Sequence, residues 1–124
     1  MARILIVDDE QDVRSTLANA LAGASHEVFE AIDGEDALRQ LSEHEMDVVV
    51  TDIIMPNREG LETIQEIRLN WPQVKIIAIS GGGRLRNVEF LYVARKLGAD
   101  FILKKPFSMN EFTSAVRKLL HAPA

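Results

Sequence analysis

Short apolar runs alternate along the chain with longer segments that are apolar on one side only. The runs occupy residues 4–7, 48–50, 74–79 and 101–103. Each is too short and too uniformly apolar for an amphipathic helix, and each is rich in β-branched or aromatic residues. These features are typical of strands buried on both faces of a parallel sheet. The stretch 26–31 mixes polar and apolar positions, and we expect it to form an edge strand.

The segments between the runs repeat their apolar residues at helical spacing. This spacing predicts helices over residues 11–22, 35–42 and 61–70, another around 88–97, and a last one that begins at Ser108. Ser108 and Glu111 have the spacing of a capping box, in which a hydroxyl and a carboxylate satisfy free backbone amides at a helix start.

The order of these elements is five β-α units, (βα)5. Right-handed crossovers and the need to cover both faces of the sheet predict a doubly wound α/β sandwich of three layers around a parallel five-stranded sheet. A single edge strand of mixed polarity, the second, favours the flavodoxin-like strand order 2-1-3-4-5. The length of 124 residues suits one domain, which we expect to span residues 1–124.

Composition excludes several classes of site. The chain has 14 basic and 19 acidic residues, and its net charge of -5 argues against a surface for nucleic acid. It has no cysteine, which excludes disulfides and thiolate metal sites. Its apolar runs are far shorter than the ~20 residues of a membrane-spanning helix. We therefore expect a cytoplasmic protein that neither inserts into membranes nor binds nucleic acid directly.

Polar residues follow the predicted strands at the end where ligands bind in such sheets. The first strand ends in residues 8–10 (Asp-Asp-Glu), the third in Asp52, the fourth in Ser80, and the fifth in Lys104 and Lys105. Each has a simpler explanation. The acids could cap the first helix, Asp52 could be a turn residue, and the serine and the lysines could be solvated. Their convergence on one edge of the sheet favours a functional site.

The acids of this edge need a cation to lie together. Two carboxylates about 4 Å apart repel by roughly 4 kcal/mol at an effective dielectric constant near 20. Oxygen ligands without histidine or cysteine favour Mg²⁺ or Mn²⁺. Together with a hydroxyl and an amine they make a phosphoryl-transfer site, in which a carboxylate would be the nucleophile. Asp52, alone on the central strand, is the best-placed nucleophile.

Five motifs in this order resemble the receiver domain of two-component response regulators (CheY-like). They are VDDE at 7–10, DIIMP at 52–56 followed by Gly60, SG at 80–81, LGAD at 97–100 and KPF at 105–107. The resemblance covers nearly the whole chain. It implies a signalling switch rather than an enzyme, one that catalyses at most its own phosphorylation and dephosphorylation.

The resemblance also implies a role for each matching residue. A sensor histidine kinase or a histidine phosphotransfer protein would phosphorylate Asp52. Mg²⁺ would be bound directly by Asp9, Asp52 and the backbone carbonyl of Ile54, and through water by Asp8.

Two further roles concern the phosphoryl group itself. Lys105, which precedes a proline through a bond that is usually cis in this family, would pair with a phosphoryl oxygen. The hydroxyl of Ser80 would bind the phosphoryl group and move the loop that comes after the fourth strand.

Among the departures from the family pattern, one concerns the switch position. Ile102 stands three residues before the lysine, where the family usually has tyrosine or phenylalanine, so the usual aromatic relay is in doubt. Phe101 is adjacent, but alternation along a strand should point it to the opposite face.

The fourth helix has apolar residues outside its main stripe, namely Val88, Leu91 and Tyr92. Isolated surface apolar residues are common. Our hypothesis is that these three, with Ile102, form a surface for a downstream protein or a homodimer, on the face made by the fourth helix, the fifth strand and the last helix.

Three alternatives stay open. A haloacid-dehalogenase-type phosphatase also uses an aspartyl nucleophile and Mg²⁺, but its Asp-x-Asp motif is replaced here by Asp8 and Glu10. A flavin-binding module would need a hydroxyl- and glycine-rich loop where these acids stand. The chain could also be a receiver fragment of a hybrid kinase or a larger regulator. Because it ends just past the last predicted helix, we expect a stand-alone receiver.

Overall fold

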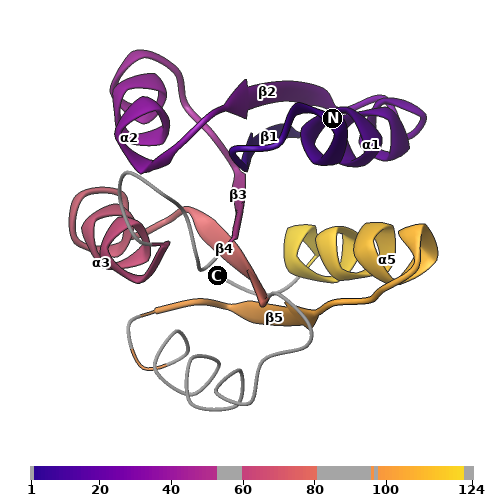
Figure 1. Cartoon of the computed structure of the whole chain (residues 1–124). Helices are drawn as coiled ribbons and strands as arrows, with labels where there is room; N and C mark the ends of the chain where they lie inside the picture. The colour runs from indigo at the N-terminus through magenta and orange to yellow at the C-terminus, as the bar shows by residue number, and fades with distance from the viewer. Residues whose placement is uncertain (1, 53–59, 81–95, 97, 122–124) are drawn as a thin grey trace.

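A computed structural model describes residues 2–52, 60–80, 96 and 98–121 (Figure 1). It contains one parallel sheet in the order β2-β1-β3-β4-β5, which confirms the predicted fold class and strand order. The strands are β1 (Arg3–Val7), β2 (Glu27–Ala31), β3 (Val48–Asp52), β4 (Lys75–Ser80) and β5 (Phe101–Lys104).

Helices cover both faces of this sheet. They are α1 (Gln11–Ala22), α2 (Gly34–Glu43), α3 (Gly60–Asn70) and α5 (Met109–Leu120). In Figure 1, α1 and α5 lie on one side of the sheet and α2 and α3 on the other. The helix predicted around residues 88–97 falls outside the described residues except at position 96, which is helical. None of the described helices has the length and apolar character needed to cross a membrane.

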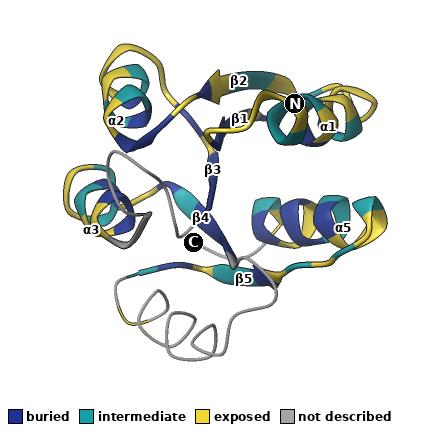
Figure 2. Ribbon diagram, in the orientation of Figure 1, coloured by how far each residue is buried: buried dark blue, intermediate teal, exposed yellow. Residues whose placement is uncertain are grey.

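The burial of the strands follows their place in the sheet (Figure 2). All five residues of β3, the central strand, are buried, whereas only the last residue of β2 is fully buried. This difference explains the sequence pattern. A strand covered by helices on both faces is apolar at successive positions, while an edge strand needs apolar residues only where a helix covers it.

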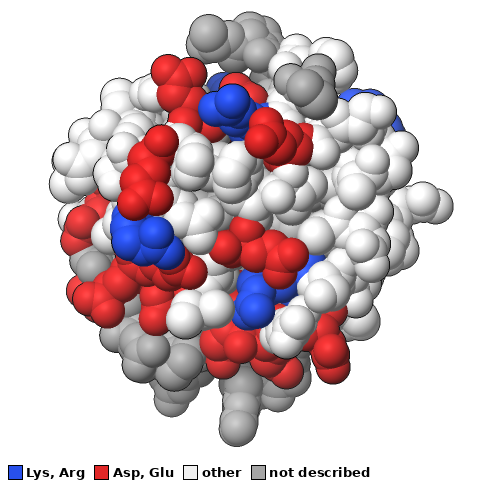
Figure 3. Space-filling model, turned by 90° about the horizontal axis from the view of Figure 1, so that it is seen from above, with Lys and Arg blue, Asp and Glu red and all other residues white. Residues whose placement is uncertain are grey.

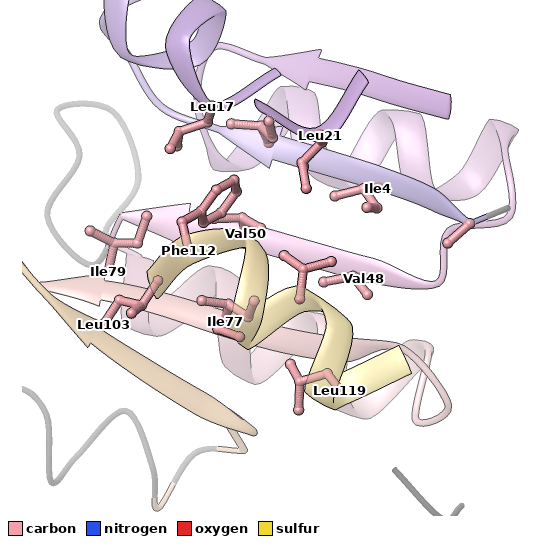
Figure 4. Packing of buried hydrophobic residues seen from close by; sticks show 14 residues of the cluster. Ile4, Leu17, Leu21, Val48, Val50, Ile77, Ile79, Leu103, Phe112 and Leu119 are labelled. Carbon is pink, nitrogen blue, oxygen red and sulfur yellow. The ribbon is translucent and has the colours of Figure 1, made fainter. Parts of the chain in front are cut away.

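Side chains of successive strand residues divide between two cores. Figure 4 shows the core on the α1–α5 side, where Phe112 of α5 and Leu17 of α1 belong to one buried cluster with Val50 and Ile77 of the sheet. Phe112 has no exposed surface. Full burial of such a side chain contributes roughly 1.5–3 kcal/mol, so this contact is a major attachment of α5 to the sheet.

Candidate functional site

Asp52 is the last residue of β3 and is paired in the sheet with Ile79 of β4. It therefore belongs to the strand rather than to the turn after it. Its exposed fraction is only 9%, and its backbone carbonyl accepts a hydrogen bond from the hydroxyl of Thr51 at 3.1 Å. The sheet thus fixes the backbone that carries this carboxylate at the edge where the parallel strands end.

Lys105 comes directly after β5 and reaches Asp52. Its Nζ atom lies 3.3 Å from Oδ2 of Asp52, with the side chain of Lys105 32% exposed and that of Asp52 12% exposed. Lys104, the last residue of β5, is exposed. The bond between Lys105 and Pro106 is cis, as the family resemblance predicts.

Asp8 follows β1 and is almost fully buried, with an exposed fraction of 3%. Its Oδ1 accepts a hydrogen bond from the backbone N–H of Glu10 at 2.8 Å. Burial raises the pKa of Asp8, and the negative charges of Asp52 and Asp9 raise it further. The hydrogen bond from Glu10 and the charge of Lys105 lower this pKa, but the net shift is upward. Asp52 and Asp9 therefore lie close enough to Asp8 to oppose its ionisation.

Helix capping does not account for these acids. Glu10 occupies the N-cap position of α1, yet its side chain makes no capping hydrogen bond. Asp8 bonds to the N–H of Glu10, ahead of the helix, and Asp9 is exposed. The side chains of Asp8, Asp9 and Glu10 thus remain grouped at the end of β1.

The side chain of Arg14, which was not predicted from the sequence, supports the turn between β1 and α1. Arg14 of α1 donates a hydrogen bond from Nη1 to the backbone carbonyl of Asp8 at 2.7 Å, and its Nε lies 3.1 Å from Glu30 of β2. Its position four residues after Glu10, one helical turn beyond the acids, was the signal that could have identified it.

The donor set fits a hard divalent cation. Carboxylate oxygens of Asp8, Asp9 and Glu10 all lie within 4.8 Å of one another. Only oxygen donors take part, which suits Mg²⁺ or Mn²⁺. Burial is the main cause of the upward pKa shift of Asp8, and the negative charges of Asp52 and Asp9 add to it. Glu10 was not predicted to be a ligand, although it continues the acidic run.

Several predicted site residues lie outside the described part of the chain. These are Ile54, Val88, Leu91, Tyr92 and the side chain of Ser80. The backbone of Ser80 ends β4, and this residue is paired in the sheet with Lys104. It therefore belongs to the same edge as Asp52.

Phe101 and Ile102 point to opposite faces of the sheet, which confirms their predicted alternation. Ile102 is partly buried and packs against the core on the α2–α3 side. Phe101 is also partly buried and packs against the core on the α1–α5 side. Phe101 therefore does not supply the missing aromatic ring on the face that Ile102 occupies.

A groove borders the candidate site between α1 and the start of α5. Its volume is about 390 Å³. The lining residues are Asp12, Val13, Thr16, Leu17, Lys105, Pro106, Phe107 and Met109. The lining is mainly apolar, and Lys105 belongs both to this groove and to the Asp52 contact. No local sequence signal indicated the groove, because its two walls come from opposite ends of the chain.

Several basic side chains elsewhere are paired with acids. Arg3 lies 3.2 Å from Glu27, and Arg39 contacts both Asp36 and Glu43. On the face seen in Figure 3, most of the blue basic groups lie against red acidic groups. The described residues of that face thus form no basic patch of the kind that binds nucleic acid.

Comparison with known proteins agrees with this geometry. The profile of the response regulator receiver domain matches residues 4–117. The transcriptional regulatory protein PrrA of Mycobacterium tuberculosis is 34% identical over 118 residues, which are 95% of this chain and 49% of that protein. The sensor kinase CckA of Brucella abortus is 34% identical over 121 residues, or 96% of this chain and 12% of that protein.

Solved structures show the same fold. A CheY-like receiver domain protein from Methanospirillum hungatei superposes with a TM-score of 0.86 at 27% identity, and the match covers 96% of this chain and 94% of that one. The chain spans only 24% to 49% of the first curated relatives that it matches, the regulators NtrC and PrrA.

Proposed function

The chain belongs to the response regulator receiver domain family, and we propose that Asp52 is the phosphoacceptor through which it works as a signalling switch. The observation that carries this proposal is the 3.3 Å contact between Lys105 and Asp52, beside the buried Asp8. Asp52 lies at the end of the central strand with the ammonium group of Lys105 against one of its oxygens. This position suits a nucleophile, because the phosphoryl group that it receives brings negative charge next to the lysine.

The proposed reaction is a phosphoryl transfer to Asp52. A carboxylate oxygen of Asp52 attacks the phosphorus of a phosphohistidine, the bond between phosphorus and nitrogen breaks, and an aspartyl phosphate forms while the histidine leaves. Lys105 stabilises the charge on the phosphoryl oxygens. The donor is a sensor histidine kinase or a histidine phosphotransfer protein.

The metal site would use the neighbouring acids. Asp9, Asp52 and the backbone carbonyl of Ile54 would hold Mg²⁺ or Mn²⁺, and Asp8 would act through a water. A bound Mg²⁺ supplies electrostatic stabilisation of the phosphoryl oxygens. Support comes from the grouping of Asp8, Asp9 and Glu10, whose mutual repulsion a cation relieves.

Phosphorylation would be communicated to a partner through the end of β4 and the edge strand β5. The hydroxyl of Ser80 would bind the phosphoryl group, and Ile102 with Val88, Leu91 and Tyr92 would contact a downstream protein or a second copy of the chain. The partly buried position of Ile102 on edge strand β5 supports this surface.

Residues 1–124 would form one receiver domain, either alone or within a larger regulator or hybrid kinase. The match to a short part of CckA and to half of PrrA supports the second arrangement as an alternative.

The test is phosphorylation of the purified chain by acetyl phosphate, with intact mass as the readout. We expect one added phosphoryl group in the presence of Mg²⁺, much less with EDTA, and none in Asp52→Asn. Sustained hydrolysis of a phosphomonoester, without a stable phosphorylated protein, would favour the phosphatase alternative.

A further inference from the structure

Arg68, near the end of α3, binds the segments that lead into β4 and β5. Its guanidinium donates to the carbonyl of Gly98 from Nη2 at 2.7 Å and from Nε at 3.2 Å. It also donates to the carbonyls of Pro72 and Val74 at 2.7 and 2.9 Å, and to Oδ2 of Asp100 at 2.8 Å. One side chain thus joins a helix to the bases, meaning the N-terminal ends, of the two neighbouring strands β4 and β5.

Asp100 carries this attachment into the sheet. Its backbone N–H donates to the carbonyl of Ile76 at 2.8 Å, and its Oδ2 accepts the N–H of Ile76, also at 2.8 Å. The pairing of Ile77 with Phe101 begins one residue further along. The carboxylate held by Arg68 therefore adds a side-chain link at the base of the β4–β5 ladder.

Gly98 is shaped to this contact. Its φ of +124° is a backbone conformation that residues with a Cβ rarely adopt. A Cβ atom there would lie 2.9 Å from Nε and 3.0 Å from Cγ of Arg68. A side chain at position 98 would therefore displace the Arg68 guanidinium.

The attachment matters because β5 leads directly into Lys105, which contacts Asp52. This strand has four residues and is bonded only to β4 within the described sheet. A slip by one residue would move the strand by about 3.3 Å and turn each side chain to the other face. The position of the base of β5 thus sets the position of Lys105.

We propose that Arg68 is a positioning residue for Lys105: through Gly98 and Asp100 it fixes the base of β5 and so holds the lysine against Asp52. This inference rests on the proposed function, in which Lys105 assists phosphorylation of Asp52. The competing explanation is that Arg68 only stabilises the fold.

A double-mutant cycle separates these explanations. Phosphorylation rates with acetyl phosphate and Mg²⁺ are measured for the wild type, Arg68→Gln, Lys105→Ala and the double variant, at a temperature where circular dichroism shows all four folded. We expect Arg68→Gln to slow the wild type about 3- to 10-fold, in the range of coupling between linked residues. In the Lys105→Ala background the same substitution should change the rate by less than about 1.5-fold, since there is no lysine left to position.

Equal slowing by Arg68→Gln in both backgrounds, or in neither, would overturn the inference and leave the proposed function intact. An unchanged rate in Lys105→Ala alone would instead refute the role of Lys105, and the inference with it.

Two further variants complete the test. Gly98→Ala strains the backbone just before β5 and displaces Arg68 without removing it, so it should give the same background-dependent slowing once circular dichroism shows it folded; slowing that persists in the Lys105→Ala background would overturn the inference. The matched control is Arg39→Gln on α2, which also breaks arginine–carboxylate contacts, with Asp36 and Glu43, but lies away from β5. Its rate should equal that of the wild type, and slowing as large as that of Arg68→Gln would overturn the inference.

Discussion

The Nζ atom of Lys105 lies 3.3 Å from Oδ2 of Asp52, although the two residues are 53 positions apart in the sequence and β5, which precedes Lys105, is not a neighbour of β3. The lysine side chain reaches from the end of β5 past β4 to the end of β3. Parallel strands make this possible because their carboxyl ends share one edge of the sheet.

Removal of this contact should slow phosphorylation. In Lys105→Ala, acetyl phosphate should modify the protein about 10- to 100-fold more slowly, since a hydrogen bond to a charged group is worth roughly 1.5–3 kcal/mol. The measurement is the rate of phosphoprotein formation by intact mass. Lys104→Ala is the matched control, because Lys104 is adjacent and exposed, and it should react at the wild-type rate. Equal slowing by both substitutions would show a general charge effect.

Divalent cations should stabilise the folded chain through Asp9 more than through Glu10. A ligand at one hundred times its dissociation constant adds about 2.7 kcal/mol to the free energy of unfolding. Urea unfolding with and without Mg²⁺ should show this gain in the wild type and in Glu10→Gln, and a gain smaller by at least about 1 kcal/mol in Asp9→Asn. If Glu10→Gln lost the gain and Asp9→Asn kept it, the ligand assignment would be wrong.

Asp8 should make stability depend on pH in the absence of metal. Its pKa is raised by burial and by the charges of Asp52 and Asp9, against the hydrogen bond from Glu10. The folded state therefore binds more protons than the unfolded state, and stability falls as pH rises above the ordinary value of 3.8 and through the raised pKa.

The substitution Asp8→Asn should remove this fall and keep the acceptor for the Glu10 N–H. In EDTA, the variant should gain stability over the wild type as pH rises from about 4 to 7, measured by urea unfolding. A constant difference between the two proteins across this range would contradict the prediction.

The fold could be predicted from sequence because the strands are buried on both faces. Burial of all of β3 forces a continuous apolar run, and the capping box of Ser108 and Glu111 marks the start of α5 as predicted. Asp52 proved to be part of its strand, since its backbone still pairs with Ile79. An apolar run alone does not mark the end of a strand when a polar residue continues the ladder.

The supporting contacts could not be predicted, for a physical reason. Arg68 reaches acceptors 30 and 32 positions away, and no periodicity links it to Gly98 or Asp100. Burial within the acidic run could not be predicted either, since Asp8 is buried and its neighbour Asp9 is exposed. Sequence identifies which residue types meet at the end of a parallel sheet, while their distances depend on tertiary packing.

The central claim is that Asp52, and not another acid of the cluster, accepts the phosphoryl group. The most direct test is to phosphorylate the chain with acetyl phosphate and Mg²⁺, trap the acyl phosphate by borohydride reduction, and locate the modified residue by peptide mass spectrometry. We predict modification at Asp52 alone, and none in Asp52→Asn. Modification of Asp8 or Asp9 in the wild type, or an undiminished yield in Asp52→Asn, would contradict the claim.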